Sequence, residues 1–171
     1  MSILDNRDWS NARIDQRILA KTIACCTLGE IREEDPRDTK SGPATAVVVP
    51  LTLEEAKPTI DGETVNPGFP VTGRIRWFTA PNLPENLAKA NEMSDQRLKQ
   101  LVVAALGMKR NTKENVGELL KTQGGWPALA GRKVLVSFDV TESNGSKFQE
   151  LASFSAFTPK PGATAAPANP Y

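Results

Sequence analysis

The stretch Arg74-Ile75-Arg76-Trp77-Phe78 brings two cations and two aromatic rings together within one short segment. On a β-strand alternate residues share a face, so the two arginines lie on the same side as Phe78, and Ile75 lies with Trp77 on the other. Single-stranded nucleic acid is bound by Lys and Arg side chains that follow its phosphates and by aromatic rings that stack on its bases. The stretch is typical of such a surface; the alternative is that both rings belong to the core and the arginines form a solvated face.

Residues 97–133 form a second cationic segment. They carry 8 Lys and Arg against 2 acidic side chains, a balance of +6, whereas residues 1–64 have a balance of −4. This asymmetry indicates either an anionic partner or two halves that pair with each other. Trp126, between Gly125 and Pro127, is either a plug over the core or an exposed ring that stacks on bases. From this segment the candidate binding site includes Lys109, Arg110, Trp126, Arg132 and Lys133.

The sequence lacks the residues on which most enzyme mechanisms depend. The chain contains no histidine, which excludes histidine acid–base catalysis, Ser-His-Asp and Cys-His pairs and histidine-ligated metals. Glycine-rich phosphate loops and nucleophile elbows are also missing. Cys25 and Cys26 have no second pair to complete a zinc site, and the acidic residues between positions 33 and 38 either surround Mg²⁺ or form a solvated loop. We therefore predict a protein that is not an enzyme and needs no metal or cofactor.

The chain also lacks the signals of secretion and of membrane insertion. Its first ten residues include Asp5, Arg7 and Asp8, so no apolar signal-peptide core is present there. The longest aliphatic run, residues 101–106, is far shorter than the roughly 20 residues that span a bilayer. We expect a cytoplasmic protein without contact to membrane.

The elements that position these residues are mainly strands. A polar arm (1–16), one β-rich domain (17–158) and a Pro/Ala-rich tail (159–171) follow from composition. The expected order is a strand within 17–28, a charged loop over 30–43, strands over 45–53 and 71–79, a helix that begins at Ser94 and ends at Gly107, and a weaker helix over 113–121. Pro50 cannot donate a ladder hydrogen bond and is expected at a sheet edge or bulge.

The final pair of strands, over residues 133–142 and 147–157, is the strongest pattern in the chain. The first strand alternates, with its inward positions at Val134, Val136, Phe138 and Val140. A two-residue turn would place Asp139 opposite Glu150, which is unfavourable. We therefore predict a three-residue turn that pairs Val140 with Phe148. Three aromatic residues are expected in the core: Phe138, Phe148 and Phe154.

Residues 71–158 resemble phage-encoded single-stranded DNA-binding proteins and related small proteins of phage replication modules. The shared pattern is a strand, a short helix that ends in ALGM (105–108), a spacer, and LAGRKVLVSFDVTESNGSKFQELASF (129–154), in which Gly-Arg opens a hairpin with an Asn-Gly turn. The resemblance implies a small β-barrel of the oligonucleotide-binding type that coats exposed single strands in the host cytoplasm. The chain differs from such proteins in that residues 159–171 hold no acidic side chain.

Together these observations predict an α+β domain of mainly antiparallel strands, a partly closed small barrel with one packed helix. Its function is predicted to be sequence-tolerant binding of single-stranded DNA, with homo-oligomers possible. The predicted binding residues are Arg74, Arg76, Phe78, Lys109, Arg110, Trp126, Arg132 and Lys133. The alternative is a virion structural or assembly protein, in which the arm and tail contact neighbouring subunits and the aromatic residues are core.

Overall fold

The computed structural model describes residues 17–143 and 145–158; the predicted arm and tail lie outside this range. The strands are β1 (Thr22–Leu28), β2 (Arg32–Thr39), β3 (Gly42–Leu53), β4 (Lys57–Pro58), β5 (Thr64–Val65), β6 (Pro70–Phe78), β7 (Lys133–Ser143) and β8 (Ser146–Ala156). The helices are α2 (Glu85–Leu106), α3 (Val116–Thr122) and the 3₁₀ helix η1 (Trp126–Leu129). The predicted class, mainly antiparallel sheet with one packed helix, is confirmed.

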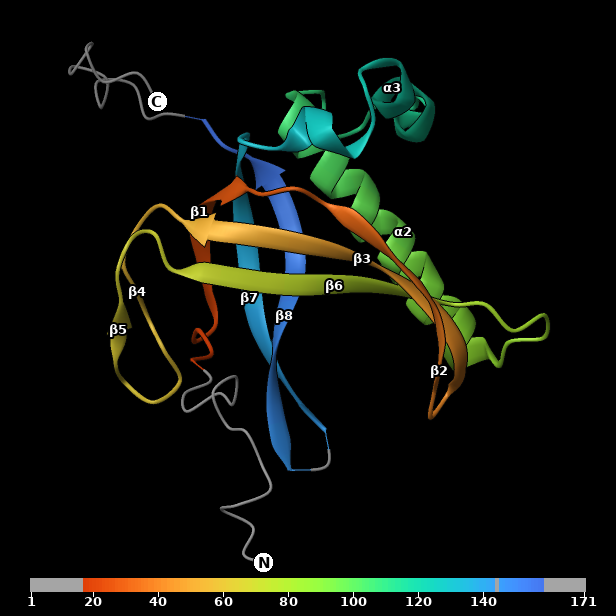
Figure 1. Ribbon diagram of the computed structural model, residues 1–171, viewed down its shortest axis with the longest axis horizontal. Coiled ribbons are helices and arrows are strands. Elements are labelled where there is room, and N and C mark those ends of the chain that lie inside the picture. Colours follow the sequence, from red (N-terminus) through yellow and green to blue (C-terminus); the bar gives the residue numbers. More distant parts are fainter. Residues whose placement is uncertain (1–16, 144, 159–171) are drawn as a thin grey trace, which may run out of the picture.

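Strand β3 organises the main sheet. Along one edge it pairs with β6, and along the other it pairs first with β2 and then with β1, all antiparallel. On its other edge β1 pairs with β7, which in turn pairs with β8. The order of the sheet is therefore β2-β3-β1-β7-β8, with β6 on the far side of β3 (Figure 1). Along the edge that pairs with β2 and β1, the pairing is interrupted between Leu28 and Arg32, and there Gly29 donates its N–H to the carbonyl of Pro50 (2.8 Å). Pro50 thus lies inside the sheet, opposite an irregular stretch of its partner.

The sheet curls until β6 and β8 approach each other, but no ladder joins these two strands in the described part of the chain. They come close at Gly73, where a Cβ atom would overlap the side chain of Leu151. Helix α2 packs against both strands (Figure 1). Glycine at position 73 therefore allows the two rims of the sheet to come close beneath the helix.

Helix α2 begins nine residues earlier than predicted, at Glu85 after Pro84. Ser94 is not its N-cap but lies within the helix, where its hydroxyl donates to the carbonyl of Arg76 (2.5 Å). The predicted end is confirmed, because Gly107 adopts the left-handed conformation (φ 69°) that closes a helix. The first turns of α2 are too polar for the apolar periodicity to mark them; burial begins with Ser94.

The prediction of a charged loop over residues 30–43 is wrong. Most of it is β2, which pairs with β3 from Arg32 opposite Val48 to Thr39 opposite Gly42, with a register shift between Glu34 and Arg37. An edge strand with a largely exposed surface needs no hydrophobic alternation, so its composition does not distinguish it from a loop.

The register predicted for the final hairpin is also wrong. Ser143 pairs with Ser146, and Asp139 lies directly opposite Glu150. The close carboxylates are tolerated because each has another partner: Glu150 accepts a hydrogen bond from Arg97 of α2 (2.6 Å), and Asp139 accepts one from the N–H of Val140 (2.8 Å). Arg97 of the helix therefore offsets the repulsion between Asp139 and Glu150 that disfavours a two-residue turn.

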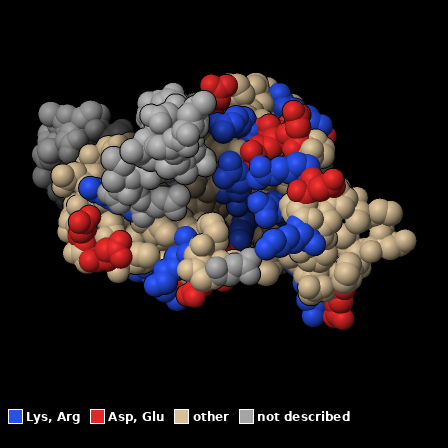
Figure 2. Space-filling model, turned by 60° about the horizontal axis from the view of Figure 1, so that its bottom comes forward, with Lys and Arg blue, Asp and Glu red and all other residues tan. Residues whose placement is uncertain are grey.

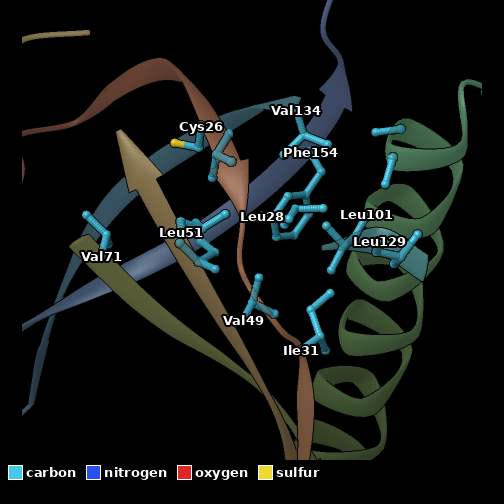
Figure 3. Packing of buried hydrophobic residues seen from close by; sticks show 14 of the residues in the cluster. Cys26, Leu28, Ile31, Val49, Leu51, Val71, Leu101, Leu129, Val134 and Phe154 are labelled. Atoms are coloured by element: carbon cyan, nitrogen blue, oxygen red, sulfur yellow. The ribbon is translucent and has the colours of Figure 1, made fainter. Parts of the chain in front are cut away.

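The core lies between the curled sheet and α2. Side chains from β1, β3, β6, β7 and α2 converge there with Leu129 of η1 (Figure 3). Phe138 and Phe154 are buried as predicted, but Phe148 is 51% exposed, because the β7–β8 hairpin extends beyond the packed region. Both cysteines are buried and free, and burial raises the pKa of the Cys26 thiol to about 12.

Candidate nucleic-acid interface

The outward face of β2, β3 and β6 carries a row of long side chains on each side of a row of short ones. The pairing sets Arg74 and Arg32 on either side of Val48, and Phe78 and Arg37 on either side of Ala44. Directly paired residues of antiparallel strands point to the same side of the sheet. We call this surface the cationic face and define it by Arg32, Glu34, Arg37, Lys40, Ala44, Ala46, Val48, Arg74, Arg76 and Phe78.

The floor of the cationic face is made of short side chains. Ala44, Ala46 and Val48 on β3 are at most 6% exposed, although they point away from the core. They lie between the longer side chains of the two flanking strands, with which they are paired. A narrow strip with cationic borders results, a shape suited to an extended polyanion.

One ion pair crosses this strip. The Nε of Arg74 lies 2.8 Å from Oε1 of Glu34, so β6 and β2 are connected across β3. The hydrogen bond from Arg74 holds the pKa of the Glu34 carboxyl below its usual range. Within the described residues, Arg32, Arg37 and Arg76 have no ion-pair partner, so three guanidinium groups of the cationic face keep their charge available.

A hollow of about 420 Å³ lies at the end of the cationic face, beside the β2–β3 turn. Its lining comprises Arg37, Asp38, Thr39, Lys40, Ser41, Arg76 and Phe78. Three of these side chains are cationic, one is acidic and one is an aromatic ring. The hollow therefore combines the two kinds of group that recognise a nucleotide unit, one for its phosphate and one for its base.

Helix α2 fixes the end of β6 that carries these residues. The Asn91 carboxamide accepts from the N–H of Phe78 (2.8 Å) and donates to its carbonyl (2.9 Å). Trp77, on the opposite face, donates its Nε1–H to Asp95 (2.8 Å) and is half-buried. The alternation predicted from the sequence is therefore observed: Ile75 and Trp77 face the helix, while the arginines face outward with Phe78.

Figure 2 shows the side of the molecule that carries the two hairpin turns. Lys and Arg side chains gather there in a band across the middle of the view, with a few Asp and Glu side chains among them. Both the β2–β3 and the β7–β8 turns lie toward this side (Figure 1). The face seen in this view is therefore rich in positive charge.

The remaining predicted residues lie at a different place, which we call the helix end: the C-terminal end of α2 and the segment that leads to β7. Arg132 donates to the carbonyls of Ala105 (3.2 Å) and Ala128 (3.0 Å). The Nζ of Lys133 lies 3.2 Å from Oε1 of Glu54. These two cations stabilise the fold by satisfying groups of the chain itself.

Other members of the helix end differ in exposure. Trp126 is half-buried and packs against the core cluster, as the plug interpretation predicts. Lys109 and Arg110 are exposed just beyond α2, and Arg110 lines a hollow of about 260 Å³ between α2 and β8. The structure thus gathers Arg74, Arg76 and Phe78 on the cationic face and separates them from Lys109, Arg110, Trp126, Arg132 and Lys133.

Sequence reasoning missed the contribution of β2. Arg32, Glu34, Arg37 and Lys40 belong to the cationic face, but all four lie in the segment that was predicted as a loop. The alternation of Arg32 and Glu34 with Glu33 and Asp35 carries no hydrophobic signal. Only the pairing with β3 shows which of these charges share a face with Arg74.

The described residues contain no group of three His, Cys, Asp or Glu side chains arranged to hold a metal ion. Among these same residues, no helix has both the length and the apolar character needed to cross a membrane. Comparison of the chain with models of known protein families gave no match, and comparison with curated protein sequences gave none either.

Proposed function

We propose that this chain binds single-stranded DNA along its cationic face, in a sequence-tolerant way, as a coating protein of a phage-type replication module. The observation that carries the proposal is the set of three arginines without ion-pair partners in the described residues, Arg32, Arg37 and Arg76, beside the half-buried ring of Phe78. Arginines on both borders of the strip follow a phosphate backbone, and the ring offers a stacking surface for a base.

A partly closed barrel of the oligonucleotide-binding type is the architecture we propose with this function. Counting β1 and β2 as one interrupted strand, the order of five strands is β6-β3-β1/β2-β7-β8, and α2 lies between the third and fourth strands of the chain. In that fold the surface of the second and third strands binds oligonucleotides. Those strands are β3 and β6 here, and they carry the floor and one border of the cationic face.

The preference for single strands follows from the mixture of groups on this surface. A duplex hides its bases in stacked pairs, so Phe78 contributes nothing to duplex binding, whereas an unpaired base can lie on the ring. Each arginine that neutralises a phosphate releases a condensed counterion. We therefore expect binding that is stronger for single strands than for duplex and that weakens as salt concentration rises.

The test is a titration of labelled single-stranded and duplex oligonucleotides at several salt concentrations, followed by fluorescence anisotropy. Arg37→Ala with Arg76→Ala removes two positive charges from the hollow on the cationic face. Lys109→Ala with Arg110→Ala removes the same charge from the helix end and is the matched control. If the cationic face binds DNA, the first double variant loses about tenfold or more in affinity and its salt dependence becomes shallower by about two counterions.

The outcomes separate the alternatives. Equal losses in the two double variants would mean that binding follows net charge and that the cationic face is not the site. No binding at low salt, or equal binding of duplex, would contradict the proposed function. A large defined oligomer in light scattering together with absent DNA binding would instead support the assembly protein.

A further inference from the structure

Glu34 occupies an unusual place for an acidic residue, because it lies on the cationic face among four arginines. It shares this face with Arg32 on its own strand, it lies across Ala46 from Arg76, and its carboxylate contacts the guanidinium of Arg74 at 2.8 Å. Its neighbour Glu33 pairs with Val47, whose side chain belongs to the core, so Glu33 projects on the other side of β2. Of the two adjacent carboxylates, only Glu34 borders the proposed path of DNA.

The contact between Glu34 and Arg74 has the chemistry of a contact between Arg74 and a phosphate. A carboxylate and a phosphate both offer anionic oxygens to the planar guanidinium, which binds either one through charge-assisted hydrogen bonds. The Glu34 side chain is 23% exposed and that of Arg74 is 44% exposed, so the pair is in contact with solvent. An ion pair in such a position contributes little to folding stability, and its removal leaves the fold intact.

We propose that Glu34 competes with the DNA phosphate for Arg74 and thereby limits the affinity of the cationic face. This inference rests on the proposed function. For a phosphate to reach Arg74, the carboxylate must give up its hydrogen bond or share the guanidinium with a second anion. Either change opposes binding, and the remaining negative charge repels phosphates that approach Arg32 and Arg76. Glu34 thus makes binding weaker and more readily reversible than the arginines alone would make it.

The experiment compares Glu34→Gln with Glu33→Gln, two variants that change the net charge equally at adjacent positions on opposite faces of β2. The amide of Glu34→Gln still accepts a hydrogen bond from Arg74 but no longer repels phosphate. We expect its affinity for a single-stranded oligothymidine at low salt to rise about two- to fivefold, the range of an exposed ion pair, and the gain to shrink as salt increases. Glu33→Gln should change affinity by less than half as much.

A second comparison tests whether Arg74 is the group for which Glu34 competes. In the background of Arg74→Ala, the gain from Glu34→Gln should fall clearly below the gain in the wild-type background, because the competition has been removed. Thermal melting of each variant checks that the fold is retained.

Four results would overturn the inference. Equal gains from Glu34→Gln and Glu33→Gln would show a general effect of net charge. A loss of affinity in Glu34→Gln would show that the carboxylate assists binding, either by positioning Arg74 or by accepting hydrogen bonds from bases. An undiminished gain in the Arg74→Ala background would assign the effect to another group. If the wild-type protein binds but the Glu34 variants do not differ from it, the proposed function stands and this inference fails; if no variant binds, both fail.

Discussion

The cationic face and the helix end hold similar numbers of basic side chains but use them differently. At the helix end, Arg132 bonds to carbonyls that close α2 and η1, and Lys133 pairs with Glu54. On the cationic face, Arg32, Arg37 and Arg76 border a strip of short side chains and have no ion-pair partner in the described residues. A count of charges along the sequence therefore does not locate a binding surface. The partners of each cation decide whether its charge is available.

The largest expected effect is the difference in stability between variants of two phenylalanines, one on each side of the sheet. Phe138 is completely buried, so Phe138→Ala should lower the free energy of unfolding by ~3–5 kcal/mol. Phe78→Ala should cost clearly less than Phe138→Ala, since that ring is only partly buried, yet it should weaken binding of single-stranded DNA. Urea denaturation and anisotropy measure the two effects. A stability loss in Phe78→Ala as large as that in Phe138→Ala would mean that the cationic face belongs to the core.

A smaller effect separates the arginines of the two regions. Arg132→Ala should lower the free energy of unfolding by about 1 kcal/mol, because two carbonyls at helix termini lose a charged donor. Arg76→Ala should leave stability within about 0.5 kcal/mol of the wild type, as solvent-facing substitutions do. Denaturation curves of both variants, with Lys109→Ala as a control at the helix end, check this. The comparison breaks down if Arg76→Ala is the more destabilising variant.

An effect confined to high pH, and absent at neutral pH, concerns a side chain that the fold withdraws from solvent altogether. Burial raises the pKa of Cys26 from its ordinary value of 9.0 to about 12, so the folded protein favours the neutral thiol. Because the unfolded chain ionises first, this contribution to stability is complete below pH 9 and is lost as the pH rises from 9 toward 12. The thiolate absorbance of Cys26 should therefore appear only near pH 12 or on unfolding. A thiolate signal of two groups already at pH 9 in the folded protein would contradict the burial of this residue.

The sequence predicted correctly those features that depend on local alternation. The faces of β6, the inward positions of β7 and the end of α2 at Gly107 all follow from spacing and residue type within a few positions. Features that depend on distant partners were missed. β2 lacks an apolar face and is defined by its pairing with β3, and the turn of the final hairpin is set in part by Arg97, a residue 53 positions before Glu150.

The same distinction holds for the candidate site. Arg74, Arg76 and Phe78 could be predicted together because they alternate on one strand. The grouping of Arg32 and Arg37 with them requires knowledge of the register between β2, β3 and β6. Lys109 and Arg110 were grouped with them on charge alone, and the structure puts these two beyond the far end of α2.

The joint between β6 and β8 has a mechanical consequence. Where strands are joined by a ladder, their spacing is held at about 4.8 Å by backbone hydrogen bonds. Here the two rims are instead connected through side chains of α2. The hydroxyl of Ser94 donates to a carbonyl of β6, and the side-chain oxygen of Gln100 accepts the N–H of Phe154 on β8 (3.3 Å). Side chains rotate and extend, whereas a ladder does not. Within the described residues, the separation of β6 and β8 is therefore set by side-chain contacts with α2 and not by backbone hydrogen bonds between the two strands.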